Sequence, residues 1–290
     1  MAIIPGLVVP APEPLEERYG LFTAALGPVE LPTHGRAGGV SYESVACGTA
    51  RAYPIGCYDG QVEVPEGGKT GEPNNATVEA SPFIAIATLE CGALGFTGTE
   101  FEAKVRRRLE NGEQGAVEAA LWTGLGLDGD GLEISSLSDT AEDVSAADEV
   151  SITGVVAALE DYAYRDQGYG SVAYIHAPVS VAAWAAEAGL IVPDGTGRGA
   201  RKRTPYGSVW VFGGGYPGTG EDGAAAPAGG AFIHITGQTT VWRSNDMHVF
   251  PADQTMNRTT NQRLLVAERE YAVSFDCFNG RAEFDPLGSS

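Results

Sequence analysis

Basic residues are scarce in this sequence, which carries 18 Lys and Arg against 38 Asp and Glu, a formal net charge of −20. A nucleic-acid-binding surface needs clustered Lys and Arg, so the composition argues against one. No apolar run reaches the ~18 residues of a membrane helix. The first residues, Met1 to Pro5, lack the basic stretch of a secretory signal. We therefore expect neither a membrane protein nor a secreted one.

Cysteine and histidine are also rare, with four of each. The cysteines form no CxxC pair, and we expect them to be free buried thiols in a reducing compartment. The histidines show no HExxH spacing; His176 and His234 sit in apolar strand patterns, which favours buried core or interface histidines. No GxSxG motif marks a nucleophile. The sequence predicts no metal, no cofactor and no enzyme. The four cysteines are Cys47, Cys57, Cys91 and Cys277.

Glycine is abundant, at 40 of 290 residues, and the hydrophobic fraction of 43% excludes a disordered chain. One glycine-rich run, Gly213–Gly220, follows a predicted strand. A phosphate-binding loop would end in Gly-Lys-Ser/Thr, whereas Glu221 and Asp222 follow here. We expect a flexible loop. The run Asp128–Gly131 begins like a calcium loop, but Leu132 stands where an oxygen ligand is required.

The charges are unevenly distributed. Residues 1–150 hold 24 acidic and 8 basic side chains, and 128–149 alone hold eight acids and no base. This acidic stretch is typical of an exposed loop or linker. The basic residues gather in two clusters. Each cluster could be a solvated face or a contact with a neighbouring subunit, and the second could also bind nucleic acid. The clusters are Arg106, Arg107 and Arg108, and then Arg198, Arg201, Lys202 and Arg203.

The N-terminal third predicts extended structure. Six prolines exclude a long helix from residues 1–36, and this arm must lie on its own domain or on a neighbour. Strands are predicted over 40–46, 50–58, 61–64 and 82–91, with an 11-residue polar turn closing a long hairpin. Alternation over 82–91 places Ile84 and Ile86 on one face of the strand. The opposite face carries Phe83, Ala85, Ala87 and Leu89.

Residues 97–123 carry the strongest helix pattern. Thr99 and Glu102 form a capping box, and Thr97 and Glu100 offer the same box two residues earlier. Apolar residues then recur at helical spacing. Gly124 is the predicted end of the helix.

The C-terminal half predicts alternating helices and strands, an α+β arrangement rather than a doubly wound one. Helices are expected over 153–164 and over 178–188, the second with Pro178 in its first turn. Strands are expected over 171–176, 208–212 and 231–236, and Gly237-Gln238 is predicted to turn the last into a hairpin with 239–243. Residues 261–277 are mostly extended, with one buried face and one wetter face in the run 271–277.

The order of these parts resembles that of the major capsid protein of tailed bacteriophages, the Hong Kong 97-type fold, which is also seen in encapsulin shells. Three runs are similar to shell proteins of actinobacterial phages and prophages. They are Arg18–Phe22, Arg107–Glu118 and Ala267–Val273. The resemblance covers the whole chain and rests mainly on the order of elements.

The resemblance implies a division of the chain. Residues 1–36 would be the N-arm and 37–96 the extended loop. Residues 97–149 would be the peripheral domain with its long spine helix, 150–245 the axial domain, and 246–290 strands returning to both domains.

The resemblance also implies a function. The chain would assemble with itself, as hexamers and pentamers, into the icosahedral head shell of a phage, in the host cytoplasm and then in the virion. Portal, scaffolding or decoration proteins are further possible partners, and double-stranded DNA would be enclosed without sequence-specific binding. An encapsulin-like compartment shell is the alternative, followed by a soluble hydrolase or binding protein.

The two basic clusters are then candidate contacts between subunits, together with Lys69 in the extended loop. Some members of the family join such a lysine covalently to an asparagine on a neighbour. Asn257, Asn261 and Asn279 are candidates here, but no motif selects one. We expect noncovalent contacts instead.

Overall fold

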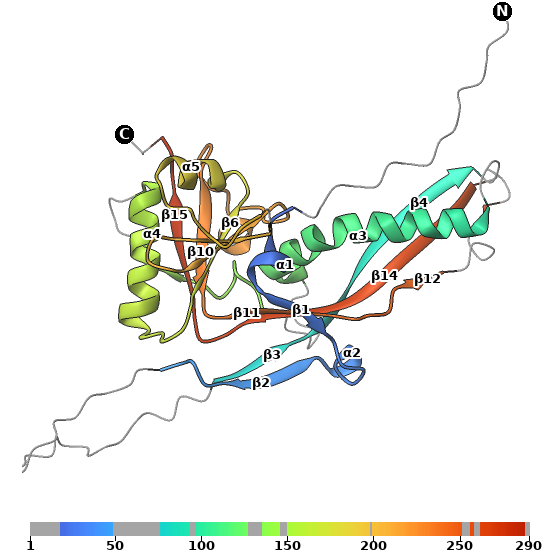
Figure 1. Ribbon diagram of the computed structural model, residues 1–290, viewed down its shortest axis with the longest axis horizontal. Coiled ribbons are helices and arrows are strands. Elements are labelled where there is room, and N and C mark those ends of the chain that lie inside the picture. The colour runs from blue at the N-terminus through green and yellow to red at the C-terminus, as the bar shows by residue number, and fades with distance from the viewer. Residues whose placement is uncertain are drawn as a thin grey trace, which may run out of the picture.

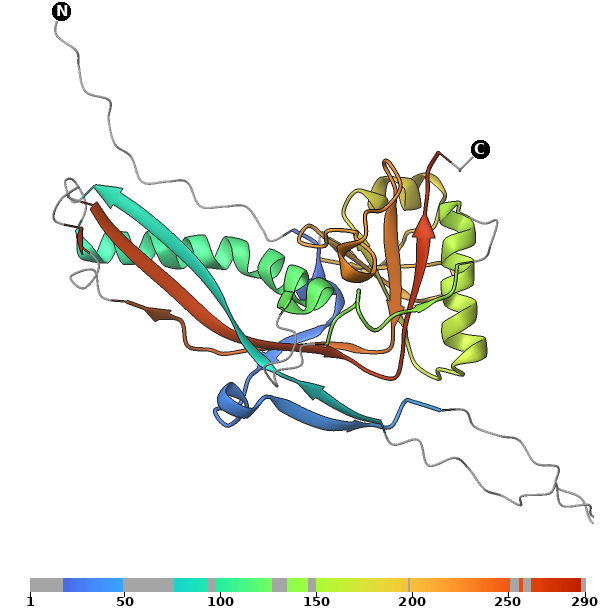
Figure 2. The same ribbon diagram turned by 180° about the vertical axis from the view of Figure 1, so that it is seen from behind.

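The computed structural model describes most of the chain, with gaps. The described residues are 18–48, 76–92, 97–126, 135–145, 150–197, 199–250, 256–257 and 262–287. Their strands form a six-stranded, a seven-stranded and a two-stranded sheet. The first two sheets lie side by side in an elongated molecule (Figures 1 and 2).

The six-stranded sheet is built around one long strand, β14, which pairs antiparallel with β4 along the whole length of β4. On its other edge β14 pairs with β11, β12 and β13, and β1 pairs parallel with β11. The strands are β1 (Leu26–Glu30), β4 (Pro82–Gly92), β11 (Thr239–Arg243), β12 (His248–Val249), β13 (Met256–Asn257) and β14 (Gln262–Phe275).

Helix α3 (Gly98–Thr123) runs along one face of this sheet (Figure 1). Its predicted end at Gly124 is confirmed, and its N-cap is Thr97 rather than Thr99, which lies inside the helix. Of the two capping boxes, the earlier one forms: the backbone N–H of Glu100 donates to Thr97 Oγ1, and the Glu100 carboxylate accepts from the backbone N–H of Thr97. Gly124 closes the helix in the left-handed conformation, and a one-turn 3-10 helix, η1 (Gly124–Gly126), follows it.

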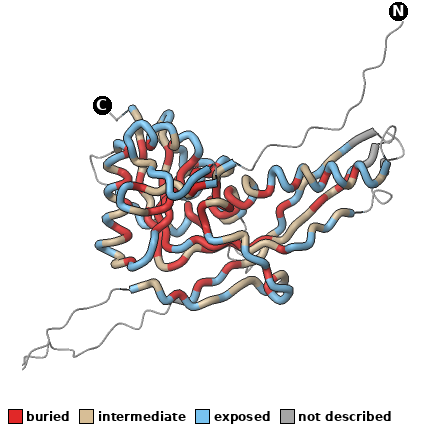
Figure 3. Tube along the Cα trace, in the orientation of Figure 1, coloured by how far each residue is buried: buried red, intermediate tan, exposed pale blue. Residues whose placement is uncertain are grey.

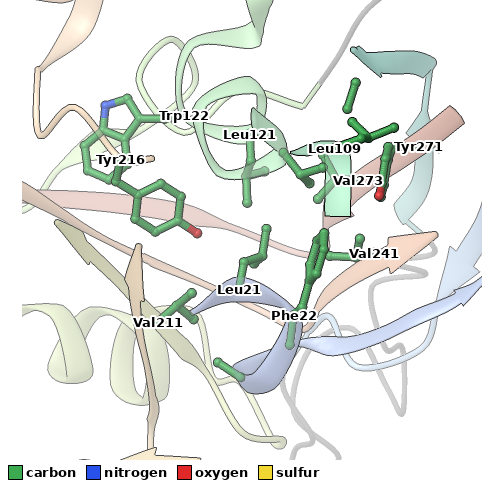
Figure 4. Close-up of a cluster of buried hydrophobic side chains, with 14 of the residues drawn as sticks. Leu21, Phe22, Leu109, Leu121, Trp122, Val211, Tyr216, Val241, Tyr271 and Val273 are labelled. Carbon is green, nitrogen blue, oxygen red and sulfur yellow. The ribbon is translucent and has the colours of Figure 1, made fainter. Parts of the chain in front are cut away.

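The core under α3 joins segments far apart in the sequence. The short helix α1 (Leu21–Ala24) is buried there, and so are side chains from β9, β11 and β14 (Figure 4). At ~25 cal/mol per Å² of apolar surface, this burial is the main stabilising term for the sheet. The labelled members are Leu21, Phe22, Leu109, Leu121, Trp122, Val211, Tyr216, Val241, Tyr271 and Val273.

The seven-stranded sheet has the order β5-β15-β10-β6-β9-β8-β7. Helices α4 and α5 pack on it, and together they form what we call the seven-stranded lobe (Figure 1). The predicted strand 231–236 and the buried face of α4 are confirmed. The strands are β5 (Glu142–Asp143), β6 (Tyr174–Pro178), β7 (Val192–Asp194), β8 (Arg201–Arg203), β9 (Val209–Gly213), β10 (Ala231–Thr236) and β15 (Asn279–Phe284). The helices are α4 (Ile152–Asp161), a π-helical turn η2 (Tyr162–Asp166), α5 (Val181–Glu187) and the 3-10 turn η3 (Glu221–Gly223).

The predicted hairpin at Gly237-Gln238 is wrong. Strands β10 and β11 belong to different sheets, so the chain crosses from the seven-stranded to the six-stranded sheet at this point. It crosses back at Asp276–Phe278, between β14 and β15. The two crossings are hydrogen-bonded: the Gln238 N–H donates to Asp276 Oδ1 at 2.6 Å, and the Asp276 N–H donates to the Gln238 carbonyl at 3.2 Å. A local turn pattern could not distinguish this crossing from a hairpin.

The predicted long hairpin also differs from the structure. Strand 82–91 forms as β4 but pairs with β14, and the hairpin partners are β2 (Val40–Ser44) and β3 (Ala76–Ala80). The β2–β3 hairpin packs on the face of the six-stranded sheet opposite α3, where Ala80, Ala272 and Leu31 form a small core. At this end of β14 the even positions Ala272 and Ser274 are buried, so the predicted wetter face is wrong there. The predicted strands 50–58 and 61–64 lie outside the described residues.

Three local expectations are corrected in detail. Residues 18–36 join the chain's own sheet through α1, β1 and the short helix α2 (Gly35–Gly38); residues 1–17 lie outside the described residues. Pro178 ends strand β6, and α5 begins only at Val181. In the acidic stretch 128–149, the described part is not a solvated linker: Leu137 is buried, and β5 pairs with β15.

Buried residues gather in the seven-stranded lobe and at its junction with α3 (Figure 3). Exposed residues increase towards the far end of α3, β4 and β14. The six-stranded sheet therefore extends from the lobe as a thin arm with less buried surface.

Candidate functional site

The described residues hold no arrangement typical of a metal or catalytic site. No three of their His, Cys, Asp or Glu side chains are grouped to hold a metal ion. No helix among them is long and apolar enough to cross a membrane. A groove of about 500 Å³ beside α4 contains Glu160 and Arg165, but both are already paired. Glu160 accepts hydrogen bonds from the hydroxyls of Thr204 and Ser208, and Arg165 forms ion pairs with neighbouring aspartates.

The two strand histidines are buried side by side, as predicted. His176 on β6 and His234 on β10 are opposite each other in the antiparallel register, and both are fully buried. His176 Nδ1 is 2.9 Å from Tyr216 Oη, and its Nε2 is 3.0 Å from Thr236 Oγ1. Both ring nitrogens of His176 are therefore satisfied.

His234 is less completely paired. Its Nδ1 is 3.3 Å from Asn279 Oδ1, while its Nε2 has no hydrogen-bond partner among the described residues. The edge of the Trp122 ring packs against it, with centroids 4.7 Å apart. Burial lowers the pKa of His176 and of His234 to about 3, because the charged imidazolium would lose its hydration. Both histidines are structural, and both are neutral near pH 7.

Two buried glutamates on α3 connect it to the rest of the fold. Glu113 accepts from Arg243 at 2.9 Å and from Arg269 at 2.8 Å, which ties the helix to β11 and β14. These partners come from distant strands, so helical spacing alone could not identify them.

Glu118 was missed entirely by the sequence reasoning. Its carboxylate accepts the backbone N–H of Leu21 at 3.1 Å and of Gly215 at 2.8 Å. Burial raises the pKa of Glu118, and these two backbone donors oppose the rise. Its position next to Val117, on the buried side of the helix, was the one available signal.

The glycine-rich run after β9 packs on α3, contrary to the expected flexible loop. Tyr216 is buried and packs against Trp122 with the two rings tilted, their centroids 5.0 Å apart. A Cβ at Gly215 would collide with the carbonyl of Gly115 on α3. The glycine therefore permits close approach of two backbones, and this run is part of the core rather than a ligand-binding loop.

Two of the four cysteines form a disulfide, Cys47–Cys277, so the expectation of free thiols is wrong for this pair. The bond lies where β2 crosses the end of β14. Ser44 Oγ donates to Asp276 Oδ2 at 2.7 Å beside it. Of the other two cysteines, Cys91 lies on β4, and Cys57 lies outside the described residues.

The predicted contact residues are not brought together. Arg106 and Arg108 are exposed on the first half of α3, and Arg106 donates to the Met247 carbonyl at 3.1 Å. Arg107, on the same turn, is half-buried. The second cluster is in the seven-stranded lobe. Lys69 and Arg198 lie outside the described residues.

The second basic cluster forms strand β8, beside the edge strand β7. Its members Arg201, Lys202 and Arg203 are half-buried. The Lys202 ammonium lies 5.4 Å from the centre of the Tyr19 ring, and Arg203 pairs with Asp194 at 2.7 Å. These bases therefore already take part in contacts within the chain.

The face of the six-stranded sheet opposite α3 exposes apolar side chains. Ile84 is 55% and Ile86 57% exposed, on the one face of β4 where the alternation placed them together. Their cross-strand neighbours are Glu270 and Glu268 on β14, and Leu264 further along β14 is 41% exposed. Neighbouring apolar side chains exposed on one sheet face are typical of a surface that another chain covers.

Asn279, a candidate for a covalent link between subunits, is occupied within the chain. Its side-chain amide donates to the Leu137 carbonyl at 2.9 Å, and it is buried. The side chains of Asn257 and Asn261 lie outside the described part of the chain.

Comparison by sequence finds no matching family and no matching curated protein. By contrast, comparison by structure finds many matching solved chains. A capsid chain of Ralstonia phage GP4 matches at a TM-score of 0.53, with 12% identity, and the match covers 98% of this chain and 96% of that one. A chain of Mycobacterium phage Ogopogo matches at 0.52 and 12% identity over 97% of both chains.

This chain has the fold of phage capsid subunits. A third match, to the capsid of an empty GTA particle, has a TM-score of 0.50 and 15% identity and covers 95% of this chain and 99% of that one. At such low identity the likeness shows the fold alone.

Proposed function

We propose that this chain is a major capsid protein, which assembles with itself into the icosahedral head of a tailed bacteriophage and encloses double-stranded DNA. The supporting observation is the whole-length match to capsid chains, in which almost no part of either chain is left over. If this chain shared only one domain with the capsid chains, the match would cover only part of each chain. The assignment implies a structural role without enzymatic activity.

The domain assignment of the Hong Kong 97-type fold follows as part of this proposal. Helix α3 would be the spine helix, and the six-stranded sheet beneath it the peripheral domain. The seven-stranded lobe would be the axial domain. The β2–β3 hairpin and the residues between its strands would form the extended loop, and the N-terminal residues the N-arm.

The contacts between subunits are assigned from exposure and charge. Ile84 and Ile86 supply an apolar surface that a neighbouring subunit would cover. Arg106 and Arg108 supply positive charge on the opposite side of the sheet, on α3, for an otherwise acidic partner copy. The half-buried Arg107, the β8 cluster, Arg198 and Lys69 complete the set of proposed contacts. Since the subunit carries a net charge of −20, such positive patches reduce repulsion between copies.

The remaining partners follow from the same function. Portal, scaffolding or decoration proteins would meet the shell, and the acidic protein would enclose DNA without binding its sequence, because attraction to phosphates would hinder packaging and release. Assembly would take place in the host cytoplasm, and the final location would be the virion.

Expression of the chain tests the proposal. We expect megadalton shells in size-exclusion chromatography and closed particles in negative-stain images. A monomer or small oligomer under every assembly condition would contradict the proposal. Particles from infected or induced cells, treated with nuclease and then opened, should release protected double-stranded DNA; an enclosed protein instead would identify an encapsulin-like compartment.

A further inference from the structure

The Cys47–Cys277 bond joins two parts of the fold that are 230 residues apart in sequence. Cys47 comes three residues after β2, beyond the end of the β2–β3 ladder where Ser44 pairs with Ala76 and the connection between the two strands begins. Cys277 lies in the crossing where the chain leaves the six-stranded sheet and enters the seven-stranded one. The bond therefore fixes this loop end of the hairpin to the junction of the two sheets.

The polar contacts around the bond hold the two segments together without it. Ser44 Oγ donates to Asp276 Oδ2 at 2.7 Å, and the Tyr42 hydroxyl is 3.4 Å from Ser274 Oγ. The other oxygen of Asp276 accepts from the Gln238 N–H at 2.6 Å. Reduced cysteines would thus remain close to each other, and the loop end of the hairpin would be held at the junction by hydrogen bonds.

The bond is accessible to small reagents. Both cysteines are half-buried, and Cys277 lines an open groove of about 360 Å³. The groove lies between β3 and the crossing at Asp276, and Thr77 and Glu79 form part of its wall. A low-molecular-weight thiol or disulfide can therefore reach the sulfur atoms without unfolding of the sheets.

We propose that Cys47 and Cys277 are thiols while subunits assemble and become a disulfide afterwards, so that the bond locks the loop end of the hairpin to the sheet junction in the finished shell. The timing rests on the proposed function, because a phage shell forms in a reducing cytoplasm and persists in an oxidising medium. The loop end of the hairpin is adjustable during assembly and is fixed once the bond has formed.

The oxidant is a low-molecular-weight disulfide. The Cys277 thiolate attacks one of its sulfur atoms, and a small thiolate leaves. The Cys47 thiolate then attacks the mixed disulfide at Cys277 and releases the second small thiolate. Two protein thiols are oxidised, the small disulfide is reduced to two thiols, and the two protons lost by the cysteines are taken up by the leaving thiolates.

Differential alkylation of the wild-type chain tests the timing. A membrane-permeant maleimide is added to producing cells before lysis, and to particles after release, and linked peptides are then identified by mass spectrometry. We expect alkylated Cys47 and Cys277 in cells and the linked peptide in released particles. The proposal is overturned if released particles lack the linked peptide, or if the bond is already complete before lysis.

A stability measurement tests the lock. Reductant should lower the unfolding temperature of released particles by about 5–10 °C. The Cys47→Ser/Cys277→Ser variant should be insensitive to reductant, whereas the matched control Cys91→Ser should respond like the wild type. An equal response of the double variant contradicts the lock.

Failure of the function and failure of the lock are distinguishable. If the chain forms no shells, the proposed function fails. The same alkylation, applied to the unassembled chain after incubation with oxidised glutathione, still reports whether Cys47 and Cys277 pair. Absence of pairing there overturns the lock whatever the chain assembles into.

Discussion

The buried histidine pair predicts a specific loss of stability in acid. His176 and His234 are neutral in the folded chain, with pKa values lowered to about 3. In the unfolded chain both return to about 6.5. Below pH 6.5 the two histidines therefore bind more protons in the unfolded state than in the folded state. The free energy of unfolding thus decreases as pH falls from 6.5 towards 3.

The magnitude follows from the linkage relation. A group with pKa about 6.5 unfolded and about 3 folded costs about 2 kcal/mol between pH 7 and pH 5. This free-energy cost hardly depends on the pKa in the folded state, provided that this pKa stays well below 5. Two such groups cost about 4 kcal/mol, a large part of the 5–15 kcal/mol that stabilises a typical domain.

Other titrating groups surround the pair and are present in every variant. Glu118 contributes with the opposite sign, because its raised pKa favours the folded state as pH falls. Tyr216, which faces His176, stays protonated, because burial raises its pKa well above the ordinary value. Comparison between variants therefore isolates the histidines.

Urea unfolding of the unassembled chain at pH 7 and pH 5, followed by tryptophan fluorescence, measures the effect. His176→Gln and His234→Gln should each reduce the difference between the two pH values by about 2 kcal/mol. Packing defects act at both pH values and cancel in that difference. The exposed His248 supplies the control: His248→Gln should leave the difference unchanged. If a core variant keeps the wild-type difference to within about 0.5 kcal/mol, the reasoning is refuted.

Three further variants probe packing and assembly. Glu113→Ala leaves the largely buried Arg269 without its carboxylate and should destabilise the chain by about 3–5 kcal/mol in urea unfolding; a loss under 1 kcal/mol would contradict the buried ion pair. Gly215→Ala places a methyl group against the α3 backbone and should cost about 1–3 kcal/mol in the same assay, so unchanged stability would refute the close approach. Ile84→Lys with Ile86→Lys, which places ammonium groups opposite Glu270 and Glu268, should leave circular dichroism and the unfolding midpoint unchanged but abolish shells in chromatography; normal shells would exclude this surface as a contact.

Local features of the fold were predictable, because local interactions determine them. The ends of α3 follow from a capping box and a left-handed glycine, both encoded within a few residues. The alternation of β4 correctly separated the exposed Ile84 and Ile86 from the packed face. Strand 231–236 followed from its β-branched and aromatic content.

Pairings between distant segments were not predictable by the same means. The sequence around Gly237 is typical of a hairpin turn. However, β10 pairs with β6 and β15, whereas β11 pairs with β1 and β14. Strand pairing is decided by which apolar faces the whole chain can bury, so a local turn signal is overridden. The Cys47–Cys277 bond and the hydrogen bonds to Glu118 also depend on contacts between distant segments, so the spacing of residues in the sequence could not predict them.

The buried polar groups concentrate where the two sheets meet, and this position has a physical explanation. The chain passes between the sheets at Gly237-Gln238 and again at Asp276–Phe278, and strand ladders end there. Backbone groups released from a ladder need other partners, because an unpaired buried polar group costs about 1–3 kcal/mol. Asp276 supplies such a partner at the crossings, and Asn279 supplies one to the Leu137 carbonyl.

Hydrogen bonds, unlike apolar contacts, require fixed distances and directions. A junction satisfied by His176, Asp276 and Asn279 therefore permits fewer relative orientations of the two sheets than an apolar interface of equal area would. A shell subunit needs one fixed orientation of its two sheets, because a small error in the angle between them would be repeated at every contact between copies. The polar junction thus gives the subunit one defined shape, although its buried histidines make the folded chain less stable in acid.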